Sequence, residues 1–395
     1  MSRHDWESAA ADWLEQLSVD SLRRARRVVR AIDATHVEVD GQTLVNFSSN
    51  DYLGLSHHTA VIAACCEAMR VHGAGAGAAP LVAGQTPLHA EAEARLAAWK
   101  QTESAVLLPS GYQANLAAIQ TLANVAKRGG KSLRILMDKL CHASLIDAVR
   151  SSDSAFRVFP HNGMEKLQRL LAEGDTGQIQ VVVTESIFSM DGDAAQLKAL
   201  SLLKLQYSFL LMLDEAHSSG VYGSAGRGLA DELGLNSLAD VSIVTLSKAF
   251  GCGGGVVCGS QVFCDALVNS ARAYIYSTAT PPVIPGALLA GLSVMENEPE
   301  LQSRLRESSK RIRDNLSRMR FQIPPGDSPI IAIILGDQNT ALNAAEQLRA
   351  AGHLCIAIRP PTVAPNTSRL RITISARHTD AELDALLTSL RSLRM

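Results

Sequence analysis

Several short segments of the sequence combine residue types that could act together on one small ligand. Lys248 follows the apolar run 241–247 and precedes glycine-rich residues, so it has few ways to remain a solvated surface ammonium. Burial favours the neutral amine, and a neutral amine can attack an aldehyde. The alternative is a buried structural lysine. The pattern therefore marks Lys248 as a candidate nucleophile.

Asp214 ends the fully apolar run 209–214, and His217 follows three residues later. A carboxylate in that position is costly unless a cation meets it. A protonated pyridine nitrogen would be such a cation, and the carboxylate would keep the ring protonated and electron-withdrawing. A helix N-cap or a magnesium ligand are the alternatives for Asp214.

The remaining two segments carry a possible phosphate site and a possible ring-stacking group. Gly111 and Tyr112 lie between an apolar run and a helical pattern, where free backbone N–H groups suit a phosphate. The alternative is an ordinary turn and helix cap. His142 follows the run 134–138 and could lie flat on an aromatic ring, although a packed, hydrogen-bonded histidine has the same appearance.

Six apolar runs of strand length alternate with helical patterns between residues 60 and 290. Most are apolar at nearly every position, as expected for parallel strands covered on both faces. The pattern predicts an α/β fold with a mostly parallel sheet and helices on both sides. Ligands of such folds bind beyond the carboxyl ends of the strands, where all four segments fall. The runs are 104–108, 134–138, 179–185, 209–214, 241–247 and 254–259.

We predict a division of the chain into three parts: residues 1–48, 49–290 and 291–395. The first part contains an amphipathic helix over 5–30 and a hairpin around Asp40-Gly41. The last part begins within a long helical stretch over 286–318 and continues as a smaller α+β domain. Its final helix opens with a capping box, Thr379 to Glu382.

Composition restricts the class of protein. The 395 residues are 47% hydrophobic, and 37 Lys and Arg balance 39 Asp and Glu, so no overall field attracts nucleic acid or a membrane. The amino terminus lacks a signal-peptide pattern, which predicts a cytoplasmic protein. Seven cysteines without C-x-x-C spacing favour reduced thiols and no metal site.

Two rival motifs fail on spacing. Residues 130–132 resemble the end of a phosphate-binding P-loop, but Val125 stands where that motif requires glycine. The glycines from 73 to 77 lack the preceding strand of a dinucleotide site. A non-catalytic nucleotide-binding protein remains the alternative from another class, and stabilisation by ATP would favour it.

At these segments the chain resembles the α-oxoamine synthases, which are fold-type-I pyridoxal phosphate (PLP) enzymes that condense an amino acid with an acyl thioester and release carbon dioxide. The resemblance runs from about residue 20 to the end. The matching motifs occur in the same order: NFSSNDYLGLS (46–56), SGYQAN (110–115), HASL (142–145), TESIFSMDGD (184–193), DEAHSSGVYG (214–223), TLSKAFG (245–251) and IYSTATPP (275–282).

The resemblance implies a role for each matching site residue. Lys248 would form the Schiff base, Asp214 would pair with the pyridinium nitrogen, and His142 would stack on the ring. Ser189 and His217 would contact the ring hydroxyl oxygen, and Glu185 would lie near the reacting thioester. The implied phosphate ligands are Gly111, Tyr112 and Thr245, with Ser277 and Thr278 reaching the phosphate of the neighbour in a homodimer. The implied substrate residues are Arg23, Asn50, His142, Arg359 and Thr362, with Arg359 on the amino-acid carboxylate.

The segment 357–376 resembles the subgroup that joins L-alanine to a pimeloyl thioester in biotin synthesis. Relatives that act on glycine tend to carry Tyr-Pro where this chain has Arg359-Pro360-Pro361. Glycine C-acetyltransferase and 5-aminolevulinate synthase are the alternatives. The acyl carrier, coenzyme A or an acyl carrier protein, stays open. Residues 73–84 depart from the family, with alanines where it often has serine or arginine.

Overall fold

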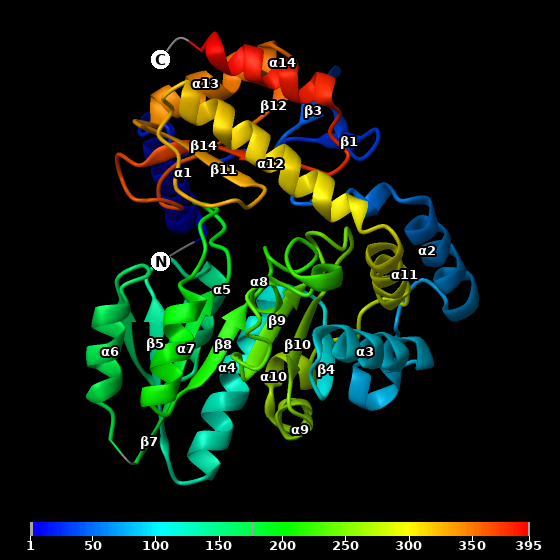
Figure 1. Cartoon of the computed structure of the whole chain (residues 1–395), viewed down its shortest axis with the longest axis vertical. Helices are drawn as coiled ribbons and strands as arrows, with labels where there is room; N and C mark the ends of the chain where they lie inside the picture. Colours follow the sequence, from blue (N-terminus) through cyan, green and yellow to red (C-terminus); the bar gives the residue numbers. More distant parts are fainter. Residues whose placement is uncertain (1–2, 176, 394–395) are drawn as a thin grey trace.

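The computed structural model describes residues 3–175 and 177–393, and its largest element is a seven-stranded sheet (Figure 1). The strand order is β4-β10-β9-β8-β7-β5-β6, and only β10 runs antiparallel to its neighbours. The prediction of a mostly parallel sheet is confirmed. The strands are β4 (Ser104–Leu108), β5 (Ser132–Asp138), β6 (Ala155–Phe159), β7 (Gln178–Glu185), β8 (Leu210–Asp214), β9 (Val241–Thr245) and β10 (Gly255–Gly259).

Helices cover both faces of this sheet, which explains the unbroken apolar runs. Val181 and Val183 of β7 face one hydrophobic cluster, whereas Val182 between them faces another. One cluster includes side chains of α4 (Gly111–Arg128), α5 (Ala143–Ser151), α9 (Gln261–Ser270) and α10 (Arg272–Ile275). The other includes side chains of α3 (Pro87–Lys100), α6 (Met164–Ala172), α7 (Leu197–Gln206) and α8 (Leu229–Glu232).

Strand β6 was not predicted. It lies at the edge of the sheet and pairs only with β5, and four of its five residues are exposed. Its sequence, AFRVF, therefore lacks the continuous burial that made the other strands recognisable.

The C-terminal part forms a smaller α+β unit above the large sheet in Figure 1, as predicted. Its antiparallel sheet has the order β11-β14-β13. The capping box from Thr379 to Glu382 opens the final helix as expected. The elements of this unit are α12 (Glu300–Arg318), β11 (Ile330–Gly336), α13 (Gln338–Ala350), β13 (Ile356–Ile358), β14 (Ser368–Thr373) and α14 (Asp380–Arg391). The preceding helix, α11 (Val283–Asn297), packs against α3 instead.

The N-terminal strands join this C-terminal unit, because β12 (His353–Leu354) pairs with β3 in a sheet of order β1-β2-β3-β12. The predicted hairpin is present, and positive φ angles at Asp40 (51°) and Gly41 (76°) fit a type I′ turn. The N-terminal strands are β1 (Val29–Ala31), β2 (His36–Val39) and β3 (Gln42–Asn46). The remaining elements outside this sheet are η1 (Leu55–His57), α2 (Thr59–His72), the π-helical turn η2 (Pro80–Gly84) and η3 (Ser224–Gly226).

Two helix predictions were wrong in extent. The first helix, α1 (Arg3–Val19), ends well before residue 30, because Ser21 adopts a left-handed φ of 54° and Leu22 donates its N–H to the Leu17 carbonyl. The long stretch 286–318 is two helices, α11 and α12. The break falls at Glu298 because a residue before proline is disfavoured in the helical region, and Pro299 caps α12.

Three further observations concern the described residues as a whole. Within residues 3–175 and 177–393, no helix has the length and apolarity needed to cross a membrane. The same residues contain no group of three or more His, Cys, Asp or Glu side chains placed to hold a metal ion. All seven cysteines are free thiols.

Candidate active site

The carboxyl ends of the parallel strands bring the predicted chemical groups to one edge of the large sheet. Glu185 ends β7 and is paired in register with Asp214 at the end of β8. Lys248 follows β9, the next strand in the sheet, and His142 follows β5 on the other side of β7. The Lys248 amine lies close enough to Asp214 and Glu185 to feel both charges. We call these four residues the lysine half of the site.

Asp214 is held by neutral donors in the lysine half. It is 5% exposed, and its two oxygens accept hydrogen bonds from the Ala216 N–H (2.9 Å) and the Asn115 side-chain amide (2.8 Å). Among the described residues it makes no ion pair with a cation. A buried carboxylate without such a partner is suited to a cationic group of a ligand.

A hydrogen-bonded chain links Asp214 to His142. Asn115, bound to Asp214, also donates to the Ser144 hydroxyl (2.9 Å), which lies 2.8 Å from His142 Nδ1. The His142 N–H donates to Glu185 Oε1 at 2.5 Å, and the histidine itself is exposed. The backbone and one ring nitrogen of His142 are thus fixed, while its ring remains accessible to a ligand.

Burial has the largest influence on the protonation of Lys248 and Glu185. It lowers the pKa of the Lys248 amine, although Asp214 and Glu185 act in the opposite direction. It raises the pKa of Glu185 well above its usual range, and the charge of Asp214 adds to this effect. Consequently Lys248 is more readily neutral, and Glu185 more readily protonated, than the same groups in water.

His217 is buried on the same edge and bonded to a residue that the sequence did not single out. Its Nδ1 lies 2.5 Å from the Tyr52 hydroxyl. Burial lowers the pKa of His217 well below its usual range, with the charges of Lys248 and Arg371 adding to this. Burial also raises the pKa of Tyr52 to about 12. A neutral imidazole and a protonated phenol therefore form this pair.

The start of helix α4 offers a cradle of backbone N–H groups that could bind a phosphate. Ser110 caps the helix through the Gln113 N–H, and helix geometry leaves the preceding N–H groups without intrahelical acceptors. A Cβ atom at Gly111 would lie 2.5 Å from the Thr245 hydroxyl, so only glycine lets these two segments approach. Tyr112 points elsewhere: it is exposed, and its hydroxyl donates to Asp147 at 2.5 Å.

Arg371 of strand β14 faces the lysine half from the C-terminal sheet. It is 8% exposed and donates to the Ser189 carbonyl (2.7 Å), the Thr373 hydroxyl (3.1 Å) and the Asn50 side-chain oxygen (3.1 Å). None of these acceptors is charged, and Arg371 makes no ion pair within the described residues. We call Arg371 and Asn50 the arginine half.

The structure places Arg359 differently from Arg371. The Arg359 guanidinium donates to the backbone carbonyls of Ser21 and Arg23 (3.0 Å to the latter). The neighbouring Arg24 donates to the Thr362 hydroxyl at 2.9 Å. Arg23, Arg359 and Thr362 line a cavity of about 780 Å³ between the N-terminal segment, α13 and β13, whereas Lys248 and Arg371 do not line it.

Ser277 and Thr278 lie near the same helix start in their own chain. The Ser277 hydroxyl accepts a hydrogen bond from the Gln113 side chain at 3.2 Å, and Thr278 is exposed. Ser277 is therefore close to the α4 cradle without any neighbouring subunit.

Sequence reasoning missed Tyr52, Asn115, Ser144 and Arg371. All four lie inside segments that resemble the family, so a signal was present. Their residue types are common in structural roles, however, and their place in the site depends on hydrogen bonds between distant segments, such as Tyr52 to His217 and Arg371 to Asn50.

These features fit PLP. The cradle at Gly111 and Thr245 would hold its phosphate, the buried Asp214 its ring nitrogen, and the exposed His142 ring could lie against its face. Lys248, which is partly buried, supplies an amine that could react with an aldehyde. The fold and the site thus define a fold-type-I PLP enzyme.

Comparison with known proteins agrees with this class. Two 8-amino-7-oxononanoate synthases, from Anaeromyxobacter dehalogenans and Maricaulis maris, are each 41% identical to the chain. The matches cover 97% and 98% of this chain and 96% of each relative. A serine palmitoyltransferase from S. paucimobilis with a bound PLP–myriocin aldimine superposes with a TM-score of 0.92 at 27% identity, covering 99% of this chain and 98% of that one.

One solved structure bears the same enzyme name as the two sequence relatives. An 8-amino-7-oxononanoate synthase from Francisella tularensis has a TM-score of 0.75 at 28% identity, covering 88% of this chain and 97% of that one. The sequence pattern of the family "aminotransferase class I and II" matches residues 42–390. The chain belongs to this family, and it is a PLP-dependent acyltransferase.

Proposed function

We propose that the chain joins L-alanine to a pimeloyl thioester, with loss of carbon dioxide, to give 8-amino-7-oxononanoate in biotin synthesis. The observation that carries this proposal is near-full-length identity of about 41% to enzymes named for that product. The site supports it, because the partly buried Lys248 amine and the buried Arg371 guanidinium lie close enough for their charges to interact, so that one amino acid could contact both.

Lys248 is proposed to move the proton at the alanine α-carbon. Burial lowers the pKa of its amine, so the neutral form that acts as a base is more readily available than in a lysine exposed to water. When bound, PLP supplies an electron-withdrawing ring that accepts the electron pair left at that carbon. Asp214 is proposed to pair with the ring nitrogen and His142 to contact the ring face.

Arg371 is our preferred partner for the alanine carboxylate. It is a buried cation whose present acceptors are all neutral, and such a group gains most from an anionic ligand. Arg359 was expected in this role from the family resemblance. Its guanidinium is instead bonded to backbone carbonyls, so Arg359 is retained only as the competing candidate.

The remaining assignments complete the proposal. Burial raises the pKa of Glu185 and so favours its protonated form, which could donate a proton or hydrogen bond near the thioester oxygen. His217 and Ser189 are proposed to contact the ring hydroxyl oxygen. Gly111, Thr245 and the backbone N–H of Tyr112 are proposed to contact the phosphate, since the Tyr112 hydroxyl is bonded to Asp147. Asn50, Arg23 and Thr362 are proposed to lie around the substrates. The proposal includes a cytoplasmic homodimer in which Ser277 and Thr278 contribute to the phosphate site of the partner subunit.

The decisive experiment is a matrix of amino acids and thioesters with product identification by mass spectrometry. Alanine, glycine and serine would each be combined with pimeloyl, acetyl, succinyl and palmitoyl thioesters of coenzyme A, and pimeloyl transfer would also be tested from an acyl carrier protein. The proposal is supported if, among all these pairs, only alanine with a pimeloyl thioester is turned over. Preferential turnover of glycine would instead favour glycine C-acetyltransferase or 5-aminolevulinate synthase.

One observation favours a second candidate. The TM-score to serine palmitoyltransferase, 0.92, exceeds the 0.75 for the Francisella enzyme, although identity is 27–28% for both. Product formation from serine and a palmitoyl thioester, without product from alanine and a pimeloyl thioester, would support that activity.

A further inference from the structure

A short loop connects the large sheet to the arginine half. Residues 187–194, here called the strap, leave the end of β7 and fold back on themselves, with Ile187 bridged to Ala194. The Ser189 carbonyl of the strap accepts from Arg371 at 2.7 Å, and Asp191 pairs with Arg369 at 2.5 Å. The Ser328 hydroxyl donates to the Gly192 carbonyl at 2.6 Å. The strap thus supplies the carbonyl that orients the Arg371 guanidinium.

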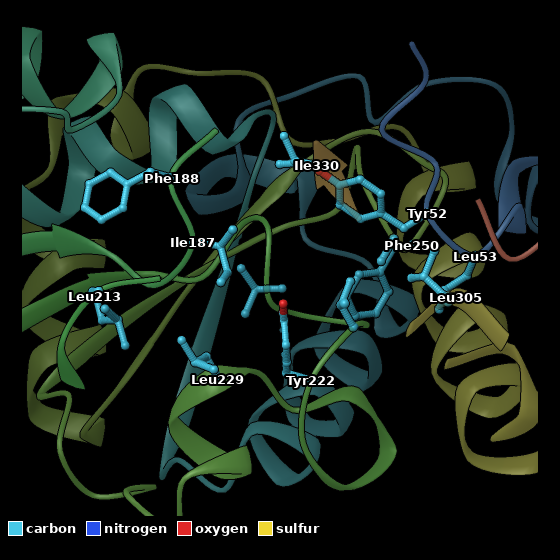
Figure 2. Packing of buried hydrophobic residues seen from close by; sticks show 14 of the residues in the cluster. Tyr52, Leu53, Ile187, Phe188, Leu213, Tyr222, Leu229, Phe250, Leu305 and Ile330 are labelled. Atoms are coloured by element: carbon cyan, nitrogen blue, oxygen red, sulfur yellow. The ribbon is translucent and has the colours of Figure 1, made fainter. Parts of the chain in front are cut away.

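His161 ties the strap to the large sheet. Its Nε2 lies 2.7 Å from Asp193 of the strap, and its Nδ1 lies 3.1 Å from Asp138, which ends β5 and is 1% exposed. The His161 and Phe188 rings pack edge to face, with their centroids 4.3 Å apart. Phe188, with Ile187 in Figure 2, belongs to the large hydrophobic cluster. His161 therefore contacts both the apolar and the charged part of the strap.

The two contacts fix the charge of His161. A neutral imidazole carries one N–H, so only the protonated ring can donate to both carboxylates at once. Burial opposes protonation, but the hydrogen bonds to Asp138 and Asp193 raise the pKa of His161 to about 10. Asp138 is itself fixed, because it accepts from the Leu140 N–H (2.9 Å) and the Asn162 N–H (2.9 Å). The contact is therefore a charged clamp with one end anchored on the sheet.

We propose that His161 is a positioning residue for the amino-acid substrate: it holds the strap, and through the Ser189 carbonyl it sets the orientation of Arg371. The inference rests on the proposed function of Arg371 as the carboxylate partner. His161 touches none of the groups of the lysine half, although the strap it holds carries Ser189, a proposed contact of the ring hydroxyl oxygen. Its removal should therefore loosen the grip on the substrate carboxylate much more than it weakens PLP binding.

The test compares His161→Gln with a matched control, His36→Gln. His36 also bridges two carboxylates, Asp33 at 3.1 Å and Glu382 at 3.2 Å, but it lies away from the strap. We expect His161→Gln to raise the KM for alanine about tenfold, with kcat and the Kd for PLP changed less than about threefold. His36→Gln should leave all three constants unchanged. Thermal unfolding of both variants shows whether they lose stability equally.

A second variant covers the case in which His161→Gln does not fold. Asp193→Asn keeps the size of the strap side chain and removes the charge that His161 meets, so it should raise the KM for alanine in the same direction, by about threefold to fivefold. An unchanged KM for alanine in either folded variant overturns the inference. A fall in PLP affinity as large as the rise in the KM for alanine also overturns it, because that result indicates general loosening of the site.

Failure of the proposed function is distinguishable from failure of this inference. If the wild-type holoenzyme shows no spectral change on titration with alanine, the proposed substrate is wrong. If the wild type binds alanine and the two folded strap variants bind it equally well, only the role of His161 is wrong.

Discussion

The two halves of the candidate site differ in charge and in the way they are built. The lysine half stands on neighbouring strands of one sheet and contains two buried acids, Asp214 and Glu185. The arginine half depends on contacts between distant segments and contains one buried cation, Arg371, bonded to neutral acceptors. An acidic half suits a cofactor with a cationic ring nitrogen, and a cationic half suits a carboxylate substrate. The contrast assigns cofactor chemistry to one side and substrate binding to the other.

The largest effect should come from the lysine half. Replacing Lys248 with Ala removes both the amine that would hold the cofactor and the proposed base, so turnover should fall at least about 10³-fold. Borohydride reduction of the wild type followed by peptide mass spectrometry should locate PLP on Lys248. Lys100→Ala is no suitable control, because Lys100 is paired with buried Glu215. The exposed Lys310→Ala is suitable, since its partner Asp314 lies on the same helix surface. Labelling of any other lysine would contradict the assignment.

The two arginines give the sharpest test of the arginine half. Arg371→Ala should raise the KM for alanine about 30-fold to 100-fold, because a charged hydrogen-bonded pair contributes about 2–3 kcal/mol. Arg359→Ala should raise it by no more than about fivefold, since this guanidinium is occupied by backbone carbonyls. Steady-state kinetics with alanine varied at saturating thioester measures both constants. The reverse ranking would restore Arg359 as the carboxylate partner.

The lysine half was largely predictable from the sequence, for a physical reason. Strands buried on both faces leave unbroken apolar runs, and the chain must place its polar ligand-binding groups where those runs end. Asp214 and Glu185 each end such a strand, and Lys248 follows one closely. Local sequence therefore indicated Asp214, Lys248 and His142, whereas Glu185 was assigned only through the family resemblance. Their protonation could not be predicted, because it depends on how completely the site is covered.

The arginine half was not predictable in the same way. Strand β14 reads SRLRIT, and its alternating arginines resemble a solvated face. All six residues are nevertheless buried, because the strap and Asn50 cover the arginines. Contacts between segments more than 170 residues apart decide this burial. The same reason explains why Tyr52 was missed, since its partner His217 lies 165 residues further along the chain.

A smaller effect should follow from adding a side chain where Gly111 approaches Thr245 in the cradle at the start of α4. A Cβ at residue 111 would lie 2.5 Å from the Thr245 hydroxyl, so Gly111→Ala must push apart the two segments proposed to hold the phosphate. We expect the Kd for PLP to rise about tenfold, which corresponds to about 1.4 kcal/mol. Gly75→Ala is the control, because a Cβ there meets nothing within 4 Å. Equal PLP affinity in both variants would remove the cradle from the site.

Acid should weaken the support of the arginine half before it affects catalysis. His378 stacks on Phe47 at 4.3 Å, accepts from the Ser375 N–H at 3.0 Å and lies 3.2 Å from the Asn46 carbonyl. These contacts tie the segment that follows β14 to the segment that precedes Asn50. Burial lowers the pKa of His378 to about 4, because the covered site disfavours the charged imidazolium. Protonation would also deprive the Ser375 N–H of its acceptor.

The sign of the pH effect follows from this lowered pKa. His378 binds a proton near pH 6.5 in the unfolded chain but only near pH 4 in the folded chain. Its stabilising contribution is therefore present above pH 6.5 and is lost as the pH falls toward 4. Between pH 7 and pH 5 the loss amounts to about 2 kcal/mol. His378→Asn, whose side-chain oxygen can still accept from Ser375, should be less stable at pH 7. Urea unfolding at pH 7 and pH 5 measures the free energy of unfolding. Between these pH values it should fall by about 2 kcal/mol less in the variant than in the wild type. Equal declines would mean that protonation of His378 does not control the acid stability of the arginine half.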